Sequence, residues 1–147
     1  MKLIITILIL AAFLQTTILP INLVLLIIVL RSFLIGEVEN LYLAFGFGLL
    51  ISHLNATPLG IESLIYLILV ILARSISRLP ISSNILIVFP LILVSVIFDT
   101  LINSFLLRQS FQLTQIMWTT VLAIPIYLVL RFWEERFVVS PQLKLKI

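Results

Sequence analysis

The polar side chains within one apolar stretch are the first candidates for chemistry in this sequence. Ser95, Asp99 and Asn103 are spaced four residues apart, which places them on one face of a helix. Because ionisable and amide groups are unfavourable in an apolar medium, such a stripe needs a protein interior or a wet cavity. It is either a contact surface for a partner or ligand, or a hydrogen-bonded seam between helices, which polar residues commonly form. We prefer the seam.

The inventory of reactive residues argues against an enzyme. The chain has no cysteine and one histidine, His53, so disulfides, thiolate metal sites and two-histidine sites are impossible. Its sequence contains no glycine-rich phosphate loop and no His-Glu-x-x-His or Gly-x-Ser-x-Gly motif. The glutamates occur in separate connections and are not expected to converge on a metal: Glu37 and Glu39, Glu62, and Glu134 with Glu135. We therefore predict a protein that is not an enzyme and has no cofactor.

The elements that position these side chains must lie in lipid. Of the 147 residues, 63% are hydrophobic and 10% are charged, and the mean hydropathy is +1.34. A soluble domain carries about a quarter of its residues as Asp, Glu, Lys or Arg, whereas disorder requires low hydrophobicity and high charge. The composition excludes both classes and predicts an integral membrane protein.

Apolar runs and helix breakers divide the chain into six segments, which we interpret as a single all-α transmembrane domain over residues 1–147. The segments are about 3–19, 22–35, 40–54, 59–76, 84–107 and 114–133. A helix needs roughly 20 residues to cross ~30 Å of hydrocarbon. Segments 22–35 and 40–54 therefore cross fully only if the bilayer thins or flanking residues join them. The short connections leave no room for a soluble domain.

The basic residues predict the orientation. If the N-terminus is cytoplasmic, the inner flanks hold eight of the nine basic residues, and the outer flanks hold only Arg108. The inner eight are Lys2, Arg31, Arg74, Arg78, Arg131, Arg136, Lys144 and Lys146. Since cytoplasmic flanks collect Lys and Arg, we predict an even number of spans with both termini in the cytoplasm. Orientation and anionic inner-leaflet lipids account for the net charge of +3, so no nucleic-acid partner is expected.

Depth separates the polar residues from the basic ones. At about 1.5 Å per residue from each segment's centre, Gln15, Asp99 and Asn103 fall in the outer half of the membrane, and His53 lies further out. Arg31 falls in the inner half, where we expect it to extend to the interface rather than pair with Asp99. The outer half is thus predicted to be the polar half.

Glycine and proline mark close packing and turns. Gly46 and Gly48 predict a close approach between segment 40–54 and a neighbouring helix. Pro58 followed by Gly60 predicts the turn into segment 59–76. With Pro125 in the last segment, these residues and the polar ones above form our set of interaction or structural candidates: Gln15, Gly46, Gly48, Pro58, Gly60, Ser95, Asp99, Asn103 and Pro125.

Four motifs follow one another along nearly the whole chain. They are residues 14–20 (LQTTILP), residues 46–50 (GFGLL) running into 57–60 (TPLG), residues 95–99 (SVIFD), and Pro125 within 118–131. Their order and spacing resemble the rod shape-determining protein MreD family of small bacterial inner-membrane proteins. In one respect the chain departs from this family. MreD-like sequences often carry an acidic residue four positions after the glycine at Gly48, where this chain has Ser52.

This resemblance implies a compact six-helix bundle that is a non-enzymatic subunit of the cell-elongation complex. MreD-like proteins bind MreC, a single-span protein, in a complex with MreB, the glycan polymerase RodA and a transpeptidase, which organises peptidoglycan synthesis and cell shape. The family is also similar in architecture to the substrate-binding subunits of energy-coupling-factor vitamin transporters. That similarity supplies an alternative, in which Gln15, His53, Asp99 and Asn103 form part of a ligand pocket.

Overall fold

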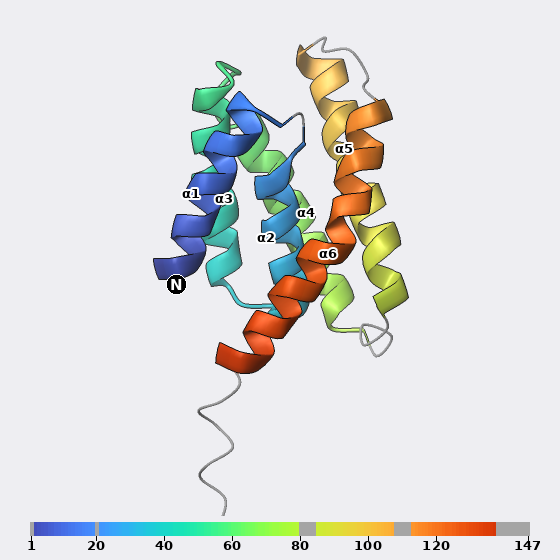
Figure 1. Cartoon of the computed structure of the whole chain (residues 1–147). Coiled ribbons are helices and arrows are strands. Elements are labelled where there is room, and N and C mark those ends of the chain that lie inside the picture. Colours follow the sequence, from blue (N-terminus) through green and yellow to red (C-terminus); the bar gives the residue numbers. More distant parts are fainter. Residues whose placement is uncertain (1, 20, 80–84, 108–112, 138–147) are drawn as a thin grey trace, which may run out of the picture.

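In the computed structural model, the described residues are 2–19, 21–79, 85–107 and 113–137, and they form six α-helices and one short 3-10 helix (Figure 1). The elements are α1 (Lys2–Thr17), α2 (Leu23–Leu34), α3 (Glu39–Leu54), α4 (Ile61–Ser77), η2 (Ile85–Ile87), α5 (Val88–Leu107) and α6 (Leu113–Phe137). The expected all-α fold is confirmed. Each α-helix overlaps one of the six apolar segments.

Successive helices run in alternating directions along one bundle (Figure 1). The ends of α1, α3 and α5 therefore lie at the same end of the bundle as the beginnings of α2, α4 and α6. The first turn of α1 and the last turn of α6 lie toward the other end. This arrangement brings residues that are far apart in the sequence together at each end.

Helix α2 is the centre of the bundle. It packs against each of the other five α-helices, and its residues from Val24 to Phe33 are all buried, as expected for a helix that is apolar all round. Its 12 residues extend only about 18 Å, which is less than the ~30 Å of a bilayer core. Ile21 and Asn22 immediately precede α2. Because α2 is short, residues of the other helices line the pocket next to its first turn.

Helices α3 and α4 approach each other most closely at Gly48. A Cβ atom on Gly48 would lie 2.4 Å from the Cα and 2.7 Å from the backbone N of Ser63. The Ser63 hydroxyl donates to the carbonyl of Phe45 at 3.0 Å and so ties the two helices together. Close packing is therefore found at Gly48, whereas a Cβ on Gly46 would meet no atom within 4 Å.

The turn between α3 and α4 follows the Pro58 and Gly60 pattern. Gly60 immediately precedes α4 and has a φ of 102°, a left-handed conformation that glycine adopts without the steric cost of a Cβ. The peptide N–H of Leu64 donates to the Gly60 carbonyl at 2.9 Å, which begins the helix. This turn orients the first residues of α4, including Glu62, toward the bundle.

The outer surface of the bundle is strongly apolar. Large apolar side chains are exposed on several helices, among them Leu10, Tyr42, Leu64, Phe105 and Met117. Two helices of the described chain, at Val88–Leu106 and Leu113–Trp133, are long and apolar enough to cross a membrane, and those at Leu3–Thr17 and Leu23–Leu34 are shorter but apolar. An apolar exterior around buried polar groups favours a membrane protein. The number of spans and the orientation stay predictions.

Candidate functional site: a polar pocket at one end of the bundle

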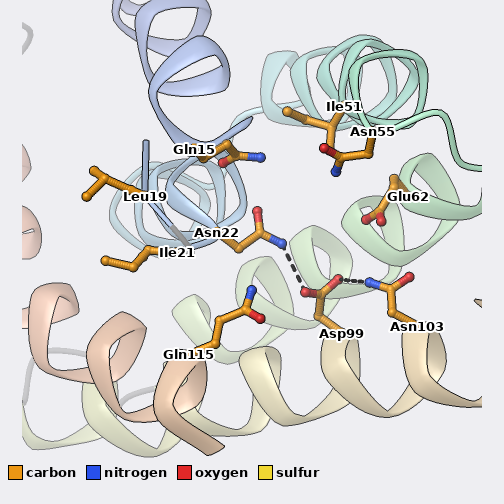
Figure 2. Close-up of a pocket in the computed structure, with 10 residues that line it drawn as sticks. All are labelled: Gln15, Leu19, Ile21, Asn22, Ile51, Asn55, Glu62, Asp99, Asn103 and Gln115. Carbon is orange, nitrogen blue, oxygen red and sulfur yellow. Dashed lines mark hydrogen bonds between the residues drawn. The ribbon is translucent and has the colours of Figure 1, made fainter. Parts of the chain in front are cut away.

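A pocket of about 120 Å³ lies where α1, α3 and α5 approach their ends and α2, α4 and α6 begin (Figure 2). It lies beyond the first turn of the short helix α2. Among the described residues, most of its lining side chains are acids or amides, and none is basic: Gln15, Leu19, Ile21, Asn22, Ile51, Asn55, Glu62, Asp99, Asn103 and Gln115.

Asp99 accepts two hydrogen bonds in this pocket. Its Oδ2 accepts a hydrogen bond from the Asn22 amide at 2.9 Å, and its Oδ1 accepts one from the Asn103 amide at 3.2 Å (Figure 2). The side-chain oxygen of Asn22, Oδ1, in turn accepts a hydrogen bond from the hydroxyl of the buried Tyr66 at 2.8 Å. This chain of bonds links α5 to the start of α2 and to α4. It is the hydrogen-bonded seam expected of the polar stripe.

Gln15 supports the same region from α1. Its side-chain oxygen accepts the backbone N–H of Val24 at 2.9 Å, an N–H that has no partner inside helix α2 because it belongs to the first turn. Gln15 and Asp99, which the depth count placed at the same level, line the same pocket. Both residues thus lie toward the same end of the bundle, and the half of the membrane that they occupy stays a prediction.

The stripe on α5 divides into two parts. Asp99 and Asn103 line the pocket. Ser95 is fully buried, and its hydroxyl donates to the Leu91 carbonyl of its own helix at 2.8 Å. Ser95 therefore satisfies its hydroxyl within α5 and does not belong to the pocket. His53, which the ligand-binding alternative included, is exposed and is also absent from the pocket lining.

Glu62 is the acidic residue of the pocket that the sequence did not place there. The sequence put it in a connection of its own, and it does lie apart from Glu37 and Glu39, but it is only 4% exposed and lines the same pocket as Asp99, which is 3% exposed. Its carboxylate points into the pocket (Figure 2). The signal was present in the sequence, because Glu62, Tyr66, Leu69 and Ala73 recur at helical spacing on the buried face of α4.

Three other pocket residues were missed. Asn22 lies just before α2, Asn55 just after α3, and Gln115 in the first turn of α6. Each lies at a helix end, where an amide is ordinarily interpreted as a solvated boundary residue. The alternating helix directions bring these boundaries to one place, and no local sequence pattern reports that.

Several polar atoms at this end have no hydrogen-bond partner among the described residues. They are Oε2 of Glu62, Oδ1 of Asn103 and the hydroxyl of Ser52. Ser52, the position that is often acidic in MreD-like sequences, is fully buried on α3. The carboxylates at this end come instead from α4 and α5, as Glu62 and Asp99. Unpartnered buried oxygens are unusual and indicate an absent water or ligand.

The arginine residues that the structure describes gather at the other end of the bundle. Arg31 is buried; it donates to the Asn40 side chain and lies 3.8 Å from the Glu37 carboxylate. Arg31 therefore pairs with residues around the turn between α2 and α3 and not with Asp99. Its side chain is buried and does not extend to the surface, as we had expected it to do. Nearby, Gly36, Ser77, Arg78, Tyr127 and Arg131 help to line a separate cavity of about 460 Å³.

Comparison of the chain with protein-family models, with curated proteins and with solved structures finds no match. The function must therefore be argued from the residues and their arrangement. In the part of the chain that the structure describes, no group of three or more His, Cys, Asp or Glu side chains forms a metal cluster. The pocket brings together two carboxylates and several amides, a set of groups that can bind a small polar species or hold helices together.

Proposed function

We propose that this chain is a non-enzymatic membrane subunit of the bacterial cell-elongation complex, resembling MreD, in the cytoplasmic membrane. The observation that carries the proposal is the gathering of the motif residues at one end of the bundle. Gln15 and Asp99, from the first and third motifs, line one pocket. Gly48, from the second motif, packs against Ser63, the neighbour of Glu62. Residues from three of the four motifs thus meet toward one end of the bundle, whereas Pro125, from the fourth, lies within α6.

The exterior of the bundle supports a scaffold role. The side chains of Ile7, Ile27, Leu122, Pro125, Ile126, Val129, Leu130 and Trp133 line an apolar groove of about 370 Å³ between α1, α2 and α6. We propose that this groove receives the transmembrane helix of an MreC-like partner. Tight packing between apolar helices drives association in membranes. MreB, a RodA-type glycan polymerase and a transpeptidase would join the same complex.

Depletion and co-purification test this function. Depletion of the chain in a rod-shaped host that depends on it should give rounded cells, and the tagged protein should retain an MreC-like protein in mild detergent. Val129→Trp should fill the groove and reduce that retention several-fold. Val94→Trp is the matched control, because Val94 is a similarly exposed valine on α5 (50% against 67% for Val129). Unchanged cell shape on depletion would refute the role. If both variants retained the MreC-like protein equally well, the groove would not be its binding site.

The predicted orientation has its own test, because the chain contains no cysteine. Val38, between α2 and α3, and Leu59, between α3 and α4, are exposed and lie at opposite ends of the bundle. Each can be replaced in turn by a single cysteine. A membrane-impermeant thiol reagent should label Leu59→Cys in intact cells, and Val38→Cys only after permeabilisation. The reverse pattern would invert the proposed topology.

A substrate-binding subunit of a vitamin transporter is the alternative, and the polar pocket is the observation that favours it. Its volume of about 120 Å³ is well below the roughly 300–1,000 Å³ of pockets that enclose small organic ligands. A vitamin would therefore need a larger pocket than this conformation offers. Tight binding of a vitamin by the purified protein, together with normal cell shape on depletion, would replace the scaffold proposal with this one.

A further inference from the structure

The described lining of the polar pocket has an unbalanced charge. Glu62 and Asp99 bring two carboxylates into it, both more than nine-tenths buried, and none of its described lining residues is basic. The helix dipoles do not compensate for these charges. Three helices end here and three begin, so the partial charges of about half a unit at each helix end cancel to first order. Two ionised carboxylates in one site repel each other unless a cation or a proton separates them.

Glu62 is the side chain that points to a ligand. Its carboxylate is directed into the pocket (Figure 2), and its Oε2 is buried with no hydrogen-bond partner among the described residues. Asp99 already accepts two amide bonds, but each carboxylate oxygen has a second lone pair available. The amide oxygen of Asn103, on the side of that amide away from Asp99 in Figure 2, also has no described partner. These oxygen acceptors converge on the pocket, where the described lining residues offer amide N–H groups but no cationic side chain.

The size of the pocket limits what can occupy it. A buried water needs roughly 10–15 Å³ of such volume, so about 120 Å³ holds a small ion together with several waters. Oxygen donors from carboxylates, amides and water are the ligands of hard cations, and Ca²⁺ accepts six to eight of them in flexible geometry. A divalent ion also neutralises both carboxylates at once.

We propose that this pocket binds one hard divalent cation, Ca²⁺ or Mg²⁺, between the carboxylates of Glu62 and Asp99. The amide oxygen of Asn103 and water complete its coordination. The bound ion joins α4 to α5, two helices that otherwise make few contacts with each other, and thereby closes the bundle at this end. The site does not depend on the proposed role in cell elongation, because purified protein alone suffices to test it.

Thermal unfolding of the full chain in detergent measures the binding. CaCl₂ or MgCl₂ should raise the Tm in a saturable manner, by roughly 8 °C when the ion exceeds its Kd a hundredfold, and isothermal titration should give one site per chain. Sodium chloride at matched ionic strength should not. A flat response to both divalent ions, or a shift given equally by methylammonium, would overturn the proposal.

Two variants assign the site to these residues. Glu62→Gln removes a carboxylate whose Oε2 has no protein partner, so the fold should be retained while affinity falls roughly 30-fold, as expected when the ligand charge is reduced. Glu39→Gln, at an exposed position at the other end, is the matched control and should bind like the parent chain. Asn103→Asp adds a carboxylate and should bind at least tenfold more tightly. Parent-like affinity in both pocket variants would contradict the assignment.

Discussion

Buried charged side chains find their hydrogen-bond partners in different ways at the two ends of the bundle. At the arginine end, Arg31 is paired with Asn40 and Glu37, residues six to nine positions away in the sequence. At the pocket end, Asp99 is bonded to Asn22, which is 77 positions away, while Glu62 keeps an unpartnered oxygen. Arg31 is satisfied by local contacts around one turn, whereas Nε of Arg74, at the same end, has no hydrogen-bond partner among the described residues. The pocket end depends on the correct assembly of several helices.

This difference indicates which end is held by contacts within the chain and which end has polar groups available to bind another species. A local ion pair forms whenever the turn between α2 and α3 forms, and it holds that turn in place. The pocket exists only when α2, α4 and α5 are assembled, and its unpartnered acceptors leave capacity for another species. Buried polar networks that are only partly satisfied are the places where ligands and partners exert their effect.

The largest effect that would sharpen this comparison is expected from packing near the pocket end. Gly48→Ala places a Cβ within 2.4 Å of Ser63 backbone atoms, so α3 and α4 must separate, at a cost of roughly 2–3 kcal/mol. Gly36→Ala is the matched change at the arginine end, where the nearest atoms are side-chain atoms at 3.4 and 3.5 Å. Thermal unfolding in detergent should show a Tm loss of roughly 6–9 °C for Gly48→Ala and little change for Gly36→Ala. Similar losses would show that the two ends are packed alike.

The next largest effect concerns the hydrogen-bonded seam. Asp99→Leu removes the acceptor for the amides of Asn22 and Asn103 and should lower stability by about 1–2 kcal/mol, because buried donors lose their partner. Tyr66→Phe, which removes the hydroxyl that donates to Asn22, should cost about 1 kcal/mol. Thermal unfolding of the two variants beside the parent chain measures both. Unchanged stability of Asp99→Leu together with lost partner binding would make Asp99 an interface residue instead of a structural one.

Sequence reasoning found the helices more readily than the pocket, for a physical reason. Apolar runs and breakers such as Pro58 and Gly60 act locally, so the helices that they predict match those observed closely. The position of Gln15 and Asp99 at a common level also followed from counting residues along helices. Of the two partners of Asp99, Asn103 lies on the predicted stripe, but Asn22 did not follow from the sequence. Asn22 and the pocket residue Glu62 reach this place only through the way in which α2, α4 and α5 pack together. Burial of Arg31 was missed for the opposite reason: its partner Asn40 is local, but the depth count considered only the membrane interface.

The smallest effect is expected from the exposed member of the arginine end. The Glu37 carboxylate lies 3.8 Å from Arg31, and its side chain is 50% exposed, a geometry in which an ion pair contributes at most about 0.5 kcal/mol. Arg31 keeps its bond to the buried Asn40, so Glu37→Gln should lower the Tm by no more than roughly 2 °C, an effect that added salt should reduce further. Asn40→Leu, which leaves the buried guanidinium without that acceptor, should cost several times more. A large loss of Tm for Glu37→Gln would mean that the arginine end, like the pocket end, depends on a charge pair for its assembly. The contrast between the two ends would then be wrong.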